Sequence, residues 1–271
     1  MDTREPPPSG DPRAAFYIDA LAHLDRTRIP FLVGGAFAHA RYTGIDRDTK
    51  DLDVFVLPDD VGRALALFKS AGYRVDLSHP HWLGKVYHGE YFIDLIFSGG
   101  NGIPRVDREW FAHAVEDDVL GVRRQLCPPE EMIWSKAFVQ ERERFDGADV
   151  LHLLRTTGPA LDWQRLLSRF GAHWLVLLSH LLLFRFAYPD QRASIPSGVI
   201  RGLLARAADQ HPEPDNHICY GTLLSREQYG HDLEHLGYAD ARLGPQGTMT
   251  RTEIQIWTDA IEEQEERSRR S

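Results

Sequence analysis

The chain has little of what a disulfide-bonded, zinc-binding or nucleic-acid-coating protein needs. Only two of its 271 residues are cysteines, Cys127 and Cys219, too few for a disulfide framework or a zinc cluster. Two free thiols fit a reducing compartment, so we expect a cytoplasmic protein. Positive charge is also scarce, because 31 lysines and arginines face 40 acidic residues and the net charge is −9. We therefore expect no extended nucleic-acid surface, although a local basic patch for one RNA or nucleotide stays open.

Targeting segments and membrane spans are not expected either. The first 13 residues are polar and rich in proline without an apolar centre, so they are no signal peptide and are predicted to be disordered. One strongly apolar run covers 174–186, but it contains Ser179, His180 and Arg185 and is too short for a bilayer. It predicts a buried helix and no membrane partner.

The pattern of apolar residues divides the chain into a mixed α/β part and a helical part. Strands are predicted near 31–33, 51–56, 73–77, 85–87, 91–97 and 121–126, with helices at 14–26, 36–42 and 58–70. Helical periodicity then dominates near 130–143, 146–155, 161–170, 173–187, 197–209 and 250–266. We expect an α/β (α+β) fold in which a small mixed-sheet core, 14–128, is followed by an all-helical domain, 129–271. A chain of this length can build one large or two modest cores.

The most informative segment is 33–56, where two apolar runs flank a glycine pair and two aspartates. Gly34 and Gly35 follow the first run, and a glycine pair after a strand lets the backbone approach a phosphate with helical N–H groups behind it. Asp51 and Asp53 open the second run. On a strand, residues i and i+2 point to the same face about 6.6 Å apart, which suits a divalent metal with phosphate oxygens in its remaining positions. Alternatively, the aspartates face solvent.

A third carboxylate interrupts another apolar run. Asp94 lies within Tyr91–Phe97, a segment of β-prone residues. A charge inside such a run is costly to bury without a partner, and metal coordination supplies one. The alternative is a charge on an edge strand. Lys85 and Asn101 flank this position in the sequence and are candidates for substrate contact.

The order Gly-Gly, spacer, Arg-x-Thr, Asp-x-Asp and a later aspartate resembles the signature of the nucleotidyltransferase superfamily, which has the DNA polymerase β-like fold. The resemblance is nearest to bacterial abortive-infection or toxin-like members and to aminoglycoside-nucleotidyltransferase-like members. It covers 30–97 best, 98–155 less well and 156–271 hardly at all. It implies two Mg²⁺ or Mn²⁺ ions held by Asp51, Asp53 and Asp94, with Asp94 also acting on the attacking hydroxyl. Gly34 and Gly35 would then cradle the phosphates of a nucleoside triphosphate such as ATP.

The resemblance also assigns nucleotide-binding residues outside the carboxylates. Arg47, Thr49 and Lys50 flank the aspartate pair; a guanidinium can clamp phosphates bidentately and a hydroxyl can donate to a phosphate oxygen, or these residues simply shape the loop. In the helical half, the toxin-like pattern of a lysine followed by Arg-x-x-Asp-x-x-Asp has a partial match in Lys136, Arg144, Asp146 and Asp149. Lys136 would neutralise the triphosphate, and Asp146 and Asp149 would position it. The alternative is a surface lysine that pairs with a nearby acid.

The predicted function is metal-dependent transfer of a nucleoside monophosphate from a triphosphate to a hydroxyl of an acceptor. The acceptor is an RNA or tRNA end, a protein side chain or a small molecule. One alternative is a non-catalytic member of the same fold that binds a nucleotide or a partner; three intact carboxylates argue against it. Another is a metal-dependent phosphohydrolase, which would not need Gly-Gly and Arg-x-Thr ahead of the aspartates. Fold alone does not decide between them.

Overall fold

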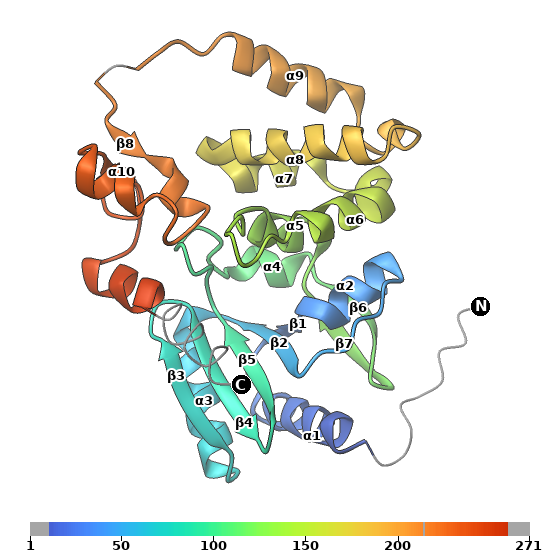
Figure 1. Ribbon diagram of the computed structural model, residues 1–271. Helices are drawn as coiled ribbons and strands as arrows, with labels where there is room; N and C mark the ends of the chain where they lie inside the picture. The colour runs from blue at the N-terminus through green and yellow to red at the C-terminus, as the bar shows by residue number, and fades with distance from the viewer. Residues whose placement is uncertain (1–10, 214, 260–271) are drawn as a thin grey trace. The chain divides into compact units, whose positions relative to one another are not determined.

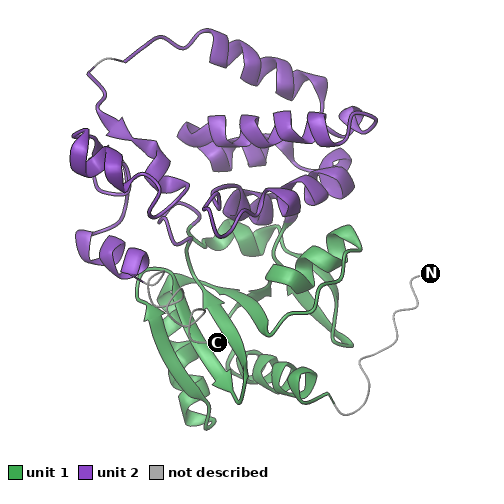
Figure 2. Cartoon of the chain, viewed as in Figure 1, with its two compact units in different colours: residues 1–98, 105–128 green, residues 99–104, 129–271 purple. Residues whose placement is uncertain are grey.

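A computed structural model of the chain describes residues 11–213 and 215–259. They form two compact units, which are described separately below. Unit 1 comprises 1–98 and 105–128, and unit 2 comprises 99–104 and 129–271 (Figure 2). The short loop 99–104 therefore belongs with the helical part of the chain. The mixed α/β fold class predicted from the sequence is confirmed.

Unit 1 is built on a mixed seven-stranded sheet with the order β3-β4-β5-β2-β1-β7-β6 (Figure 1). Its strands are β1 Phe31–Val33, β2 Asp51–Val56, β3 Arg74–His79, β4 Leu83–His88, β5 Tyr91–Ile96, β6 Val115–Val119 and β7 Val122–Leu126. β2 pairs parallel with β5 and antiparallel with β1, and β1 pairs parallel with β7. The first two predicted strands have the observed bounds, and the other predicted strands differ by one or two residues at an end.

Alternation along the central strands separates a buried face from a more polar one. Leu52, Val54, Val86, Ile93 and Leu95 share one face and are fully buried. The helix α3 Val61–Ser70 packs on this face, and the helix α1 Pro12–Thr27 packs beside α3. A Leu65 methyl group of α3, for example, would lie 3.3 Å from a Cβ placed on Gly84 of β4. The opposite face of the same strands carries the charged side chains.

The other helices of unit 1 lie at strand ends. α2 Gly35–Thr43 begins directly after β1, and a 3-10 turn, Pro58–Asp60, leads from β2 into α3. α4 Arg108–Ala112 buries Trp110, whose ring packs against Phe55 with centroids 5.0 Å apart. α1 begins two residues earlier than expected, because Asp11 caps it and Pro12 occupies its first turn. The rest of the predicted disordered segment, residues 1–10, lies outside the described residues.

Unit 2 is mainly helical (Figure 1). Its longer helices are α5 Pro129–Ala137, α6 Gly147–Thr157, α7 Trp163–Phe170, α8 Trp174–Ala187 and α9 Ser197–Ala208. Residues 251–259 are also helical, and the predicted continuation to 266 lies outside the described part of the chain. Two short parallel strands, β8 Ile218–Cys219 and β9 Ala239–Asp240, and a short helix, α10 Gly230–His235, were not predicted. They lie in stretches rich in glycine, histidine and aspartate, where no apolar period develops.

The predicted helix 130–143 ends six residues early, at Ala137. After it the backbone turns back, with a bridge between Gln140 and Phe145. Glu141 accepts two hydrogen bonds from Arg226, at 2.7 and 2.9 Å. Long-range pairing of this kind overrides the local helical propensity of a Gln-Glu-Arg-Glu-Arg segment.

α8 is buried on one side only. Trp174, Leu177, Leu181 and Phe184 are buried, whereas the opposite side exposes apolar side chains, including Phe186 at 86%. The expectation of a buried helix is therefore half right. By length and composition alone, the helical stretch 163–187 also passes as a membrane span. In the structure a 3-10 turn, Gly171–His173, divides that stretch into α7 and α8.

A buried ion network ties α5 to α7. Glu131 has no exposed surface, and its carboxylate accepts hydrogen bonds from Arg165 at 2.5 and 2.6 Å and from Arg169 at 3.0 Å. Glu130 pairs with Arg165 as well and accepts the amide of Asp162 at 2.8 Å. Two carboxylates and two guanidinium groups thus pair with one another at side chains that are at most 14% exposed.

Removing one carboxylate from this network should strongly destabilise the protein. Glu131→Ala leaves two guanidinium groups without their main acceptor, and breaking a buried pair typically costs about 3–5 kcal/mol. The matched control is Glu116→Ala, which removes an exposed partner of Arg123 on β6 and should cost less than about 1 kcal/mol. Urea unfolding measures both; equal losses would contradict a special contribution of the network.

His180 of α8 predicts how stability changes with pH. Burial lowers the pKa of this imidazole, and its hydrogen bond to the carbonyl of Ala137 offsets that only in part. The unfolded chain therefore binds a proton at a higher pH than the folded one, and the free energy of unfolding should fall as the pH drops below about 6.5. Burial also lowers the pKa of His173, which changes the stability in the same direction. His180→Gln should flatten the decrease between pH 7 and 5; an unchanged slope would contradict this assignment.

Candidate active site

The two aspartates of β2 and the single aspartate of β5 come together on the polar face of the unit 1 sheet. In the parallel pairing of β2 with β5, Asp53 lies directly opposite Asp94, and Asp51 lies opposite Phe92. Residues that are paired in register share a face, so all three carboxylates point to the same side. Each is partly exposed, whereas the alternate residues Leu52 and Ile93 are buried. The apolar side of the strands thus fixes where the carboxylates lie.

The glycine pair lies beside Asp53. Gly34 donates its backbone N–H to the carbonyl of Asp53 at 2.9 Å and precedes the first turn of α2. Gly35 has φ +52°, a conformation that favours glycine, and a Cβ there would lie 1.6 Å from Asp53 Oδ2. The Asp53 carboxylate therefore rests directly on the backbone at the start of α2. Larger residues would push it away.

The loop before β2 is held by side chains from elsewhere in unit 1. Thr49 donates its hydroxyl to the carboxylate of Asp51. Arg13 of α1 binds Asp48 at 2.5 Å and the carbonyl of Thr49 at 2.8 Å, a contact that the sequence did not predict. Arg47 is exposed, with its guanidinium 3.4 Å from the ring of His39. Lys50 is exposed as well.

Lys85 balances part of the negative charge. It lies opposite Asp94 in the β4–β5 pairing, and its Nζ is 2.6 Å from Asp94 Oδ1. The same ammonium lies 4.2 Å from the centre of the Phe92 ring. Sequence position alone placed Lys85 near Asp94 as a candidate for substrate contact; in the structure it forms an ion pair with that aspartate.

The donor set of this face fits a divalent cation. Asp51, Asp53 and Asp94 offer hard oxygen ligands, the kind that Mg²⁺ and Mn²⁺ prefer. Three carboxylates against one ammonium leave excess negative charge on one side of a sheet. The close approach of Asp53 to Gly35, where any side chain would intrude, adds a second sign that the backbone was shaped around this carboxylate.

A second charged cluster lies within unit 2 and contains the other predicted residues. Lys136 Nζ of α5 is 3.0 Å from Asp146 Oδ2 and 2.8 Å from Asp149 Oδ2. Arg144 binds Asp146 with two hydrogen bonds, at 3.0 and 2.9 Å. Burial alone would raise the pKa of Asp146, but Arg144 and Lys136 hold that pKa below its ordinary value. The pairing with a nearby acid that we considered for Lys136 is therefore present.

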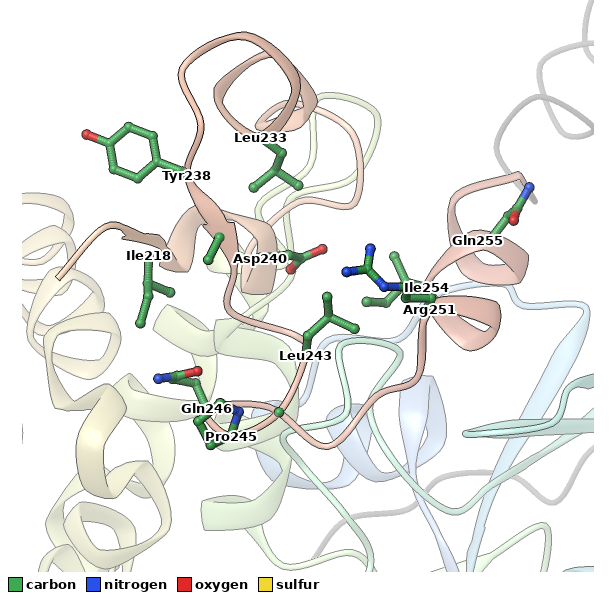
Figure 3. A pocket seen from close by; sticks show the side chains of 12 residues that line it. Ile218, Leu233, Tyr238, Asp240, Leu243, Pro245, Gln246, Arg251, Ile254 and Gln255 are labelled. Atoms are coloured by element: carbon green, nitrogen blue, oxygen red, sulfur yellow. The ribbon is translucent and has the colours of Figure 1, made fainter.

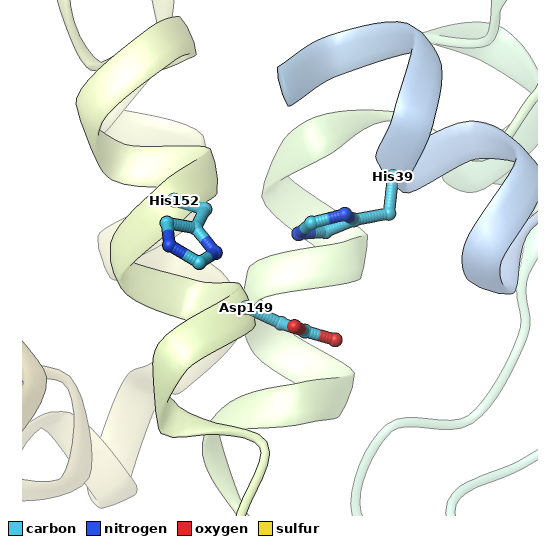
Figure 4. Close-up of side chains that lie close together, drawn as sticks. All are labelled: His39, Asp149 and His152. Atoms are coloured by element: carbon cyan, nitrogen blue, oxygen red, sulfur yellow. The ribbon is translucent and has the colours of Figure 1, made fainter. Parts of the chain in front are cut away.

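Asp149 and His152 both lie on α6, one helical turn apart (Figure 4). Asp149 is buried, with only 8% of the residue exposed. Its carboxylate is turned toward Lys136 rather than toward solvent. Asp149 and Lys136, grouped by the sequence motif, thus lie together in the structure.

The side chain of Asn101, a candidate for substrate contact, is hydrogen-bonded to the backbone of unit 2. It is buried in unit 2, donates to the carbonyl of Leu223 at 2.7 Å and accepts the amide of Ile103 at 3.0 Å. Its side chain thus shapes the loop 99–104.

Two hollows are lined by residues of unit 2 alone, and none of their lining residues belongs to the predicted site. One, of about 600 Å³, has walls that include Ile218, Tyr238, Asp240, Leu243, Arg251 and Ile254 (Figure 3). The carboxylate of Asp240 in its wall is bound by Arg242 at 2.7 to 3.0 Å. The other, of about 400 Å³, is lined mainly by aromatic and aliphatic side chains. Neither combines the acidic and glycine features of the unit 1 face.

No protein-family profile and no curated protein sequence matches this chain. Among solved structures, the chain is similar to the antibiotic-resistance factor ANT(2'')-Ia, with 16% identity, a TM-score of 0.37 and coverage of 73% of this chain and 97% of that one. It is also similar to the lincosamide antibiotic adenylyltransferase LnuA, with 15% identity, a TM-score of 0.39 and coverage of 53% and 96%. A third is an antigenic nucleotidyltransferase-like protein from Paracoccidioides brasiliensis, with 16% identity, a TM-score of 0.45 and coverage of 69% and 96%.

Substitution of Gly35 tests the close contact with Asp53. Gly35→Ala combines a left-handed backbone, which costs a non-glycine residue about 1–2 kcal/mol, with a clash that moves the Asp53 carboxylate. Gly44→Ala is the matched control, because Gly44 has φ +74° and a Cβ added there would have no other atom within 4 Å. Both variants should lose similar backbone stability in urea unfolding, but only Gly35→Ala should lose further stability and divalent-ion binding. Identical behaviour of the two variants would contradict the contact.

Proposed function

We propose that this protein is a metal-dependent nucleotidyltransferase that transfers a nucleoside monophosphate from a nucleoside triphosphate to a hydroxyl of an acceptor. The observation that carries the proposal is the register of β2 and β5, with Asp53 beside Asp94 and Asp51 on the same face. The glycine turn before α2 adjoins these carboxylates. A bare pair of aspartates is common, but three convergent carboxylates next to a helix-initiating glycine pair suit a triphosphate and its cation.

Each residue of the unit 1 face has a role in this proposal. Asp51, Asp53 and Asp94 would hold Mg²⁺ or Mn²⁺. Gly35 would direct its backbone N–H to a phosphate oxygen, and Gly34, whose own N–H is bound by the carbonyl of Asp53, would let the phosphates approach the backbone closely. The bound cations would neutralise the phosphates and make the acceptor hydroxyl more acidic. Thr49, which donates to Asp51, would keep that carboxylate oriented. Arg47 and Lys50, both exposed, would contribute positive charge to phosphate binding.

The chemical step is an in-line displacement at the α-phosphorus. The acceptor oxygen forms a bond to the α-phosphorus, the bond to the bridging oxygen of the β-phosphate breaks, and pyrophosphate leaves. The proton of the acceptor hydroxyl passes to the Asp94 carboxylate or through it to solvent. Little covalent help is needed from the protein, because transfer depends mainly on positioning and charge.

Lys136 and Asp149 are proposed to act on the triphosphate as well, as the resemblance to toxin-like members implies. In unit 2, the ammonium of Lys136 is shared between two aspartates. A phosphate would therefore compete for a lysine that is already oriented by carboxylates. This assignment rests on the motif and on that local cluster alone.

A labelling experiment separates transfer from mere binding. The full chain is incubated with each α-phosphate-labelled nucleoside triphosphate, Mg²⁺ or Mn²⁺ and a cell lysate, and products are divided into RNA, protein and small-molecule fractions. We expect label in one fraction, which names the acceptor class. Release of labelled nucleotide without incorporation would instead indicate a phosphohydrolase. Nucleotide binding without label anywhere would favour the non-catalytic alternative.

Asp53→Asn should reduce labelling about 100-fold or more, because the central carboxylate of the cation site loses its charge. The fold should remain, since an amide of nearly the same shape replaces the carboxylate at a partly exposed position. Asp59→Asn, on the exposed 3-10 turn after β2, is the control and should label like the wild type. Thermal unfolding verifies both variants. Full labelling by Asp53→Asn would contradict the proposed site.

A further inference from the structure

Charged residues form a row across four neighbouring strands of the unit 1 sheet. In the order β3, β4, β5 and β2, the paired residues are Asp76, Lys85, Asp94 and Asp53. Paired residues point to the same side of a sheet, so these four side chains lie in one line. Their charges along it are negative, positive, negative and negative. The row therefore places one lysine between the candidate cation site and a further aspartate.

Lys85 is held on the Asp94 side of this row. Its ammonium is 2.6 Å from Asp94 Oδ1, and the side chains of the pair are only 22% and 14% exposed. The Phe92 ring, 4.2 Å from the ammonium, adds a second favourable contact. Partial burial strengthens the attraction relative to an exposed pair. One oxygen of Asp94 is thus engaged by a protein cation.

We propose that Lys85 is a built-in counter-cation of Asp94, which competes with a divalent ion for this carboxylate. This inference rests on the cation site in the proposed function. Without the lysine, three carboxylates on one face would repel one another and attract any free divalent ion. With it, the negative charge is partly neutralised and the ion meets a competitor. The protein alone should therefore bind divalent ions weakly.

Asp76 gives the displaced ammonium a second position. It lies opposite Lys85 on the other side, on β3, and is exposed. In the structure its carboxylate accepts a hydrogen bond from Ser78 Oγ at 3.0 Å. A lysine side chain is a compact charge on a flexible stem of four carbons, so it can move between neighbouring strands without a change in the backbone. Lys85 would thus pair with Asp94 in the cation-free state and with Asp76 when the cation is bound.

The test is a titration of the full chain with Mn²⁺ in the absence of nucleotide. Binding is measured by calorimetry or from the EPR signal of free Mn²⁺. Lys85→Met and Lys85→Gln should bind Mn²⁺ about tenfold more tightly than the wild type, and the gain should shrink at high salt. Lys85→Arg, which keeps the charge, should show much less gain. Lys69→Met removes an exposed lysine of α3 and controls for net charge.

Two further variants examine the two positions of the ammonium. Asp94→Asn in the Lys85→Met background should abolish the gain, because the competition takes place at that carboxylate. Asp76→Asn should weaken Mn²⁺ binding a few-fold, because the displaced ammonium loses its second partner. Unfolding curves confirm that each variant is folded.

Equal Mn²⁺ affinity in the wild type and both neutral Lys85 variants would overturn the inference, as would an equal gain in Lys69→Met. Failure of the proposed function gives a different result. Tighter Mn²⁺ binding by Lys85→Met, with no nucleotide transfer by the wild type or any variant, would support the counter-cation and contradict the proposed transferase function. Nucleotide transfer by the wild type, together with an unchanged Mn²⁺ affinity in Lys85→Met, would support the transferase function and contradict the counter-cation.

Discussion

The parallel pairing of β2 with β5 is the interaction on which the candidate site depends. It places Asp53 beside Asp94, and the buried residues Leu52 and Ile93 between these positions hold the register. A shift of β2 by one residue would bring Asp51 and Asp53 to the apolar face and expose Leu52. The free energy that the core gains from burying these side chains therefore also keeps like charges side by side. Site and core are two faces of the same strands.

Much of this arrangement could be predicted from the sequence. Asp51 and Asp53 at the start of an apolar run, and Asp94 inside another, are local signals, and the structure brings them together on one face. The strand β6 was missed because Val115-Glu-Asp-Asp-Val119 is mostly polar; it pairs with β7, where Arg124 lies opposite Asp117. Asp117 binds Arg41 of α2 and Arg124 binds Asp25 of α1, so contacts with distant parts of the chain rather than an apolar period accompany this hairpin.

The sequence does contain a signal for the ion pair of Lys85 with Asp94, namely the short loop between the two strands that carry them. The two-residue loop Gly89-Glu90 connects β4 to β5, with Gly89 at φ +62°, and a hairpin with so short a loop fixes its register. Counting outward from the loop puts Lys85 opposite Asp94. The pairing of Lys85 with Asp76 could not be counted in this way, because the register shifts between Asp76 and His79. Where a strand pairing contains such a shift, the partner of a residue cannot be found by counting along the sequence.

A counter-cation in the acidic face has a consequence for the order of binding. A divalent ion alone must replace the ammonium at Asp94 with only the protein carboxylates as compensation. An ion that arrives with a triphosphate brings further oxygen ligands and negative charge, which offset the lost ion pair. Binding of ion and nucleotide would then be mutually favourable, and by linkage each would raise the affinity for the other by the same factor. In the proposed function, a lysine opposite an aspartate in a hairpin would thus make binding of the cation depend on binding of the nucleotide.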